Sequence, residues 1–113
     1  MGKKYWKVLD LGEIAAGGSS SKSWTADNDY ILNKMWAVEV NDESLSNVTA
    51  TIKVAEEYET KDAIPLSSLG QDLETAWKPK VEISKGQKIS ITATNNYTAS
   101  RTVKICLEIE LKA

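Results

Sequence analysis

Histidine is absent from this sequence, and cysteine occurs once. Without histidine the chain cannot form a Ser-His-Asp or Cys-His catalytic group, nor a metal site with histidine ligands. The single cysteine, Cys106, excludes an internal disulfide. Cys106 alternates with Ile105 and Leu107 in a long apolar stretch, so we expect a structural thiol rather than a reactive one.

The chain also lacks an excess of positive charge. It has 14 basic and 16 acidic residues, a net charge of −2, and Arg101 as its single arginine. Proteins that bind nucleic acid use basic groups to contact the phosphates, and arginine is the residue that pairs with phosphates through two hydrogen bonds. We therefore expect no nucleic-acid partner.

Long apolar runs are missing as well, since no stretch approaches the roughly 18 apolar residues of a membrane span. The first residues include lysines but no apolar core of a signal peptide, because Lys7, Asp10 and Glu13 interrupt it. We expect no membrane association and no signal peptide, with synthesis in a host cytoplasm. A chain whose leader had been removed would read the same way.

Motifs of common enzyme classes are lacking: the sequence has no nucleophile elbow, phosphate-binding loop, dinucleotide fingerprint or HExxH. Three glutamates at 56–59 form an acidic run, which is typical of a solvated turn rather than of carboxylates facing each other across a cleft. The turns 27–29 and 41–43 offer oxygen ligands but lack the spacing of a calcium loop. We expect no enzyme, no catalytic residues, no metal and no cofactor.

What the sequence does contain is alternation of apolar and polar residues, as in strands with one buried face. In the clearest case, apolar residues occupy every second position from Val103 to Leu111. The same period appears at 48–54 and 89–93, and at Trp36, Val38 and Val40, which places Trp36 in the core. Eight strands are predicted within a single domain of residues 1–113: 4–11, 20–25, 30–41, 47–56, 62–66, 80–84, 87–95 and 101–112.

Turn residues separate these strands. Gly86 can supply a positive φ between the strands 80–84 and 87–95, which predicts that the two form a hairpin. The loop 95–100 contains two asparagines and predicts a second hairpin, leading into the last strand.

One stretch, 66–77, departs from the period of two. It follows Pro65 and ends before Pro79, and its apolar residues occur at near-helical spacing: Leu66, Leu69, Leu73, Ala76 and Trp77. The stretch is therefore either a short helical turn or an irregular crossover at the edge of the sheets.

Eight short strands with regularly spaced turns predict an all-β fold, a two-sheet antiparallel β-sandwich. A jelly roll is favoured because it has eight strands. An immunoglobulin-like sandwich is the second choice, because such domains usually contain a pair of cysteines and this chain has only one.

Four tryptophans and four tyrosines occur without any phenylalanine. Carbohydrate-binding modules built on β-sandwiches stack sugar rings on exposed aromatic side chains and bind the hydroxyl groups with polar ones. The candidates for such a glycan site lie at or near predicted strand ends and loops: Trp24, Tyr58, Trp77 and Tyr97. The alternative is that these side chains cover the ends of a thin core.

The first and last strands are predicted to be long, and each lies almost at a terminus. Terminal strands of this length, if at a sheet edge, would invite pairing with another subunit. The alternative is that both are central strands of a monomer.

Two segments resemble small β-sandwich (jelly-roll) proteins of viral particles. Residues 83–96 contain a Lys-Gly turn, an I-x-I run and a T-N-N run, and residues 63–70 are similar to a connection in such proteins. The proteins that these segments resemble are capsid, decoration and fibre components of phages and archaeal viruses. The resemblance covers about a fifth of the chain and implies a structural role in a multi-subunit shell, with no catalytic residues to carry over.

These observations predict a non-enzymatic structural protein that self-associates as a homo-oligomer or with other subunits of a virion. The alternative is a carbohydrate-binding module that uses the loop aromatics to hold a glycan. A third hypothesis is a small binding protein that recognises another protein through its loops.

Overall fold

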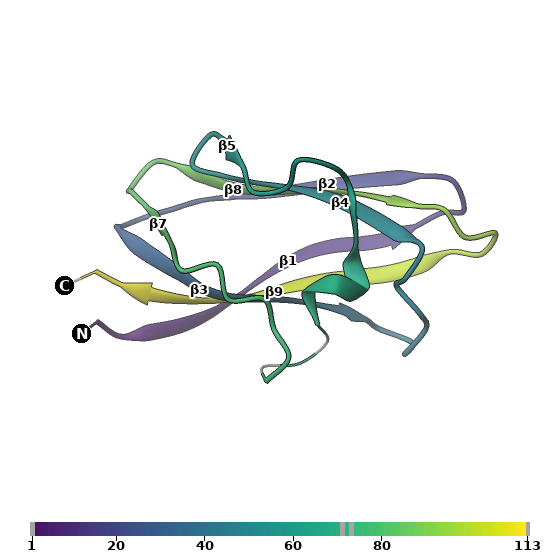
Figure 1. The fold of residues 1–113 in the computed structure, drawn as a ribbon, viewed down its shortest axis with the longest axis horizontal. Coiled ribbons are helices and arrows are strands. Elements are labelled where there is room, and N and C mark those ends of the chain that lie inside the picture. The colour runs from purple at the N-terminus through teal and green to yellow at the C-terminus, as the bar shows by residue number, and fades with distance from the viewer. Residues whose placement is uncertain (1, 71, 73, 113) are drawn as a thin grey trace.

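Two antiparallel sheets lie face to face in the computed structural model of the chain, which describes residues 2–70, 72 and 74–112 (Figure 1). Sheet A contains, in spatial order, β1 (Lys4–Ile14), β9 (Arg101–Leu111), β3 (Tyr30–Glu39) and β7 (Val81–Ile83). Sheet B contains β2 (Ser19–Thr25), β8 (Lys88–Asn95), β4 (Val48–Val54) and β5 (Glu57–Tyr58), with the short β6 (Ile64–Pro65) also paired to β4. The prediction of an all-β, two-sheet antiparallel sandwich is confirmed.

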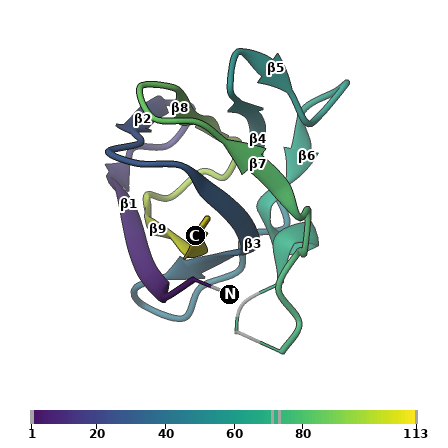
Figure 2. The same cartoon turned by 90° about the vertical axis from the view of Figure 1, so that its left-hand side faces the viewer.

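Most consecutive strands lie in different sheets, so the chain passes repeatedly from one layer to the other. Figure 2 views these two layers from the end at which both termini lie. When the two-residue β6 is set aside, eight strands in two layers of four remain, which is the strand number of a jelly roll. The jelly-roll topology itself stays a prediction.

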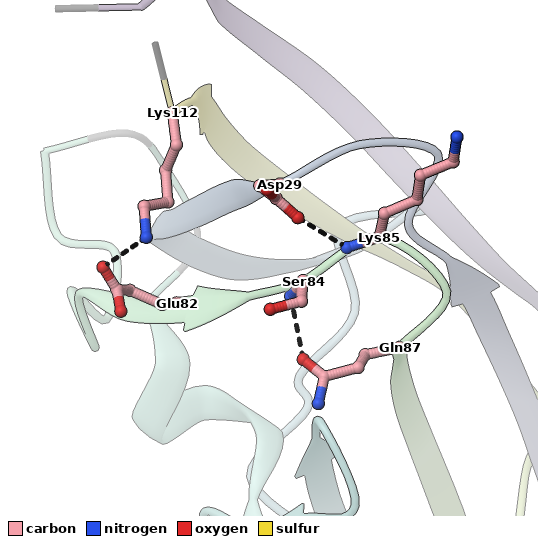
Figure 3. A network of polar contacts seen from close by, with 6 residues as sticks. All are labelled: Asp29, Glu82, Ser84, Lys85, Gln87 and Lys112. Carbon is pink, nitrogen blue, oxygen red and sulfur yellow. Dashed lines mark hydrogen bonds and ion pairs between the residues drawn. The ribbon is translucent and has the colours of Figure 1, made fainter.

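The predicted hairpin between 80–84 and 87–95 is wrong. β7 pairs with β3 in sheet A, whereas β8 pairs with β2 and β4 in sheet B. Gly86 does adopt a positive φ of 90°, but the turn directs the chain across the sandwich. A contact with another loop holds it there, because the backbone N–H of Lys85 donates to Asp29 at 2.8 Å (Figure 3).

The predicted second hairpin, through the loop 95–100, is also wrong, because β8 and β9 belong to different sheets. The loop is fastened by Asn95, whose buried amide donates to the carbonyl oxygens of Ile14 and Ala99, both at 2.9 Å. Since a buried amide must find such partners, Asn95 fixes the loop at the end of β1 rather than beside β8.

The stretch 66–77 contains one short helical turn, the 3₁₀ helix η1 (Leu66–Leu69), so this alternative is confirmed. It begins directly after Pro65 and buries its two leucines in the core. Leu73 lies outside the described residues.

The core fills the space between the sheets. The alternating apolar residues of β4, β8 and the greater part of β9 are buried, as their period predicts: Val48, Ala50, Ile52, Val54, Ile89, Ile91, Ala93, Val103, Ile105, Leu107 and Ile109. Burial of each such large side chain stabilises the fold by about 1.5–3 kcal/mol. One continuous cluster connects the two layers.

Trp36 is buried as predicted, with only 8% of its side chain exposed, but it does not belong to the cluster between the sheets. In the register of sheet A, Met35 and Ala37 lie opposite Leu107 and Ile105, which face the core. Since successive side chains of a strand alternate between faces, Trp36 lies on the outer face of sheet A.

The two terminal strands differ in position. β9 is central, between β1 and β3, whereas β1 is an edge of sheet A. A bulge interrupts β1 after Asp10, at Gly12, which has a φ of 69° and donates its N–H to the Asp10 side chain at 2.9 Å. Because a bulge bends an edge strand and disturbs its free hydrogen-bonding groups, it limits pairing along this edge.

Candidate functional site

The outer face of sheet A carries a group of apolar side chains that three neighbouring strands supply. We call it the apolar face and define it by Trp6 and Val8 of β1, Cys106 of β9, and Trp36 and Val38 of β3. Val8, Cys106 and Trp36 lie side by side in one row across the strands. Trp6 is 69% exposed and Val8 48% exposed. Exposure of two neighbouring large apolar side chains is a feature of interaction sites.

Aromatic contact organises the centre of the apolar face. The rings of Trp6 and Trp36 meet edge to face, with centroids 6.2 Å apart and planes at 86°. Cys106 is half-buried beside Trp36, and burial raises the pKa of its thiol, while the charge of Lys104 acts in the opposite direction. The thiol therefore stays protonated at neutral pH and adds to the apolar surface.

Charged residues border the apolar face at both ends. In the row at one end Lys4 of β1 lies opposite Glu110 of β9, and in the row at the other end Asp10 of β1 lies opposite Lys104 of β9. At one end the positive charge is on β1 and the negative charge on β9, and at the other end the two charges are exchanged. A hydrogen bond from Asn33 is the main cause that lowers the pKa of Glu110, against the effect of burial and with help from Lys4.

A second candidate is a pocket of about 420 Å³ beside β4, β6 and η1. Its apolar wall includes the half-buried Trp77, one of the four predicted glycan-contacting aromatics. Polar groups from the segment 59–62 form the other wall, with Glu59, Lys61 and Asp62 among them. An apolar wall with a few polar groups is the usual composition of a small-molecule site.

Tyr58 lies next to this pocket but outside it. Its side chain is 66% exposed, and the ammonium group of Lys53 lies 5.4 Å from the ring centre. Thr60 and Lys61 line both the Trp77 pocket and a hollow beside Tyr58. The structure therefore brings Tyr58 and Trp77 to the same segment of chain.

Trp24 belongs to another aromatic cluster, at the end of the sandwich near the termini. Its ring centroid lies 5.6 Å from that of Tyr30, which also meets Tyr5 edge to face at 6.4 Å. The Tyr30 hydroxyl donates to Asp27 at 2.6 Å. This hydrogen bond, burial and the Asp27 charge together raise the pKa of Tyr30 to about 12. Trp24 thus helps to cover one end of the core.

Tyr97 performs a structural role at the opposite end. Its hydroxyl oxygen accepts a hydrogen bond from the backbone N–H of Asn47 at 3.0 Å and bonds the hydroxyls of Ser44 and Ser46, both at 2.9 Å. The guanidinium of Arg101 lies 4.0 Å from the ring centre. These contacts tie two loops together, so the four predicted aromatics do not share one face.

Sequence reasoning missed the apolar face. A signal was present, because Tyr5, Trp6, Val8 and Leu9 put large apolar residues at both odd and even positions of the first strand. A strand with this pattern is apolar on both faces, and only one of them can face the core.

Sequence reasoning also missed a buried carboxylate. Glu39, 5% exposed, accepts hydrogen bonds from the backbone N–H groups of Thr102 at 2.8 Å and of Glu43 at 3.1 Å. Burial by itself raises the pKa of Glu39, but these N–H groups, that of Asn41 and the charge of Arg101 outweigh it and lower the pKa. Glu39 fastens the loop after β3 and acts as a structural group.

Within the described part of the chain, no group of three or more acidic or cysteine side chains is placed to hold a metal ion. Among the same residues, no helix is long and apolar enough to cross a membrane. No protein-family model matches the chain, and comparison with curated protein sequences finds no significant match.

Proposed function

We propose that this chain is a non-enzymatic structural protein that self-associates through the apolar face. The observation that carries the proposal is the 69% exposure of Trp6 beside Val8 on the outer face of a regular sheet. A buried tryptophan removes about 150–250 Å² from water, worth about 25 cal/mol per Å². Covering the exposed part of Trp6 would therefore contribute about 3–4 kcal/mol per subunit before the costs of association.

The setting that we propose is a virion, in which the chain would be a capsid, decoration or fibre-type subunit. This part rests on the resemblance of segments 63–70 and 83–96 to such proteins. The second segment runs from the last residue of β7 through the turn at Gly86 and along β8, and it joins the two sheets rather than forming a hairpin.

Association is tested by light scattering after size-exclusion chromatography over a wide range of protein concentration. Wild-type protein is expected to form a larger species as concentration rises, and Trp6→Ser to shift this transition at least about tenfold higher. Tyr58→Ser is the matched control, because Tyr58 is equally exposed, at 66%, but lies at the edge of sheet B. A wild-type chain that stays monomeric at millimolar concentration would overturn the proposal.

A second candidate function, glycan binding, is favoured by the Trp77 pocket. Its apolar wall can stack on a sugar ring, while Glu59, Asp62 and Lys61 can bind hydroxyl groups. A glycan array followed by titration of tryptophan fluorescence tests it. Trp77→Leu should abolish a genuine signal, and Trp6→Leu should leave it unchanged; the reverse result would exclude the pocket.

A further inference from the structure

The charges around the apolar face form a pattern that is complementary to itself. Along β1 the outward residues run Lys4, Trp6, Val8, Asp10, which is a cation, two apolar residues and an anion. Along β9, which is antiparallel, Glu110 lies beside Lys4 and Lys104 lies beside Asp10. Reversing the strand direction therefore exchanges Lys4 with Asp10 on β1 and Lys104 with Glu110 on β9.

We propose that the partner on the apolar face is a second copy of this chain, related to the first by a two-fold axis. The axis lies midway between the two facing copies of sheet A, parallel to their planes and perpendicular to their strands. This inference rests on the proposed function and specifies its geometry. The axis places β1 over β1 in opposite directions, so Trp6 meets Val8 of the second copy. It also places Lys4 against Asp10 and Glu110 against Lys104 of the second copy, four favourable pairs in each dimer.

The other two-fold arrangement is disfavoured by the same charges. An axis parallel to the strands and centred on β9 would place Glu110 against Glu110 and Lys104 against Lys104. Like charges directly opposed across an interface are repulsive. Pairing along the edge of β1 is disfavoured too, because the Gly12 bulge breaks the regular strand after Asp10.

The middle of the proposed interface carries balanced charge. Glu108, only 8% exposed, lies opposite Lys34 in the register of β9 and β3, in the same row as Trp6. The four strands of sheet A have 11, 11, 10 and 3 residues. At about 3.4 Å per residue and about 4.8 Å per strand, their outer face measures roughly 570 Å², close to the about 600 Å² per partner at the lower end of specific interfaces.

Charge reversal with complementation tests this geometry. Lys4→Glu creates repulsion with Asp10 of the second copy, and Asp10→Lys creates repulsion with Lys4, so each variant alone should associate about tenfold more weakly than wild type. In an equimolar mixture of the two variants, both contacts are favourable again, and a mixed dimer should form with about wild-type affinity. Native mass spectrometry distinguishes the mixed dimer from the two homodimers by mass.

Four controls keep the test decisive. Lys88→Glu makes the same charge change as Lys4→Glu on an exposed residue of sheet B and should leave association unchanged. Asp10→Lys removes the acceptor for the Gly12 N–H, so its thermal unfolding is checked, and Lys104→Glu mixed with Glu110→Lys repeats the test at the other pair. At 1 M salt the charge effects should disappear, whereas the effect of Trp6→Ser should remain.

The outcomes separate the two proposals. Preferred formation of the mixed dimer in either set supports the two-fold geometry. Association that Trp6→Ser abolishes but charge reversal leaves unchanged, in both sets, overturns the geometry and retains the apolar face as the interface. A wild-type chain that remains monomeric, or that binds only a different protein through this face, overturns self-association itself.

Discussion

Trp6 stands edge-on against Trp36 on the outer face of sheet A, with ring centroids 6.2 Å apart. One member of the pair is 8% exposed and the other 69%. The buried ring stabilises the subunit, and the exposed ring remains available for contact with another molecule. The two tryptophans should therefore separate folding from association.

Substitution of these two residues should give very different changes in stability. Trp36→Ala is expected to lower the free energy of unfolding by about 3–5 kcal/mol, because it removes a buried ring and leaves a cavity on the outer face of sheet A. Trp6→Ala is expected to lower it by about 1 kcal/mol or less, since most of the ring already contacts water. Urea unfolding at a protein concentration that favours the monomer measures both changes. Equal losses of unfolding free energy would contradict the assignment of Trp36 to the fold and of Trp6 to association.

Glu39 should make the fold sensitive to acid. Its pKa is lowered in the folded state relative to the ordinary value of 4.5, so its contribution is fully present above pH 4.5 and is lost as the pH falls below that value. Glu39→Gln should cost about 2 kcal/mol at pH 7 because charged hydrogen bonds are lost. Urea unfolding at a series of pH values measures this difference. Between pH 5 and pH 3 the variant should also lose less stability than wild type. Parallel plots of stability against pH for the two proteins would contradict the structural role of Glu39.

Tyr30 should make the fold sensitive to base. Its folded-state pKa of about 12 exceeds the ordinary value of 10.0, so the unfolded chain releases this proton first as the pH rises. The contribution is fully present below pH 10 and is lost between pH 10 and 12, by up to about 3 kcal/mol. Unfolding of wild type and Tyr30→Phe over this range checks the expectation, since the variant should lack this part of the slope.

Cys106 should report occupation of the apolar face. Its raised pKa predicts slow reaction with a thiol reagent at neutral pH. Association through the apolar face should slow the reaction further, by about tenfold at concentrations where the larger species dominates. Trp6→Ser should remove this dependence on concentration. A reaction rate that is independent of concentration in associating wild-type protein would place the interface elsewhere.

Much of the local structure could be predicted from sequence. Ile105 and Leu107 alternate with charged or polar neighbours, so their side chains had to share one face, and both are buried. The burial of Trp36 was predicted, but its face was not, because its neighbours Met35 and Ala37 are apolar as well. Where both faces of a strand are apolar, the period cannot say which of them faces inward.

The candidate sites were less accessible to sequence reasoning. Trp77 is a candidate from sequence because it is an aromatic residue near a predicted loop, but the pocket beside it depends on Glu59 and Asp62, which belong to a distant turn. Trp6 was overlooked because its exposure depends on β1 lying at the edge of sheet A. Neighbours that are remote in sequence decide both properties.

The sequence by itself determined that strands would form, where most of them begin and end, and which residues of β4, β8 and β9 would be buried. These properties depend on the alternation of side chains within single strands and on turn residues between them. Only the tertiary structure decided that β7 and β8 lie in different sheets, that β9 is central, and that Trp6 is left in solvent. Strand partners are selected by long-range contacts that bury the most apolar surface, and no local pattern encodes that choice.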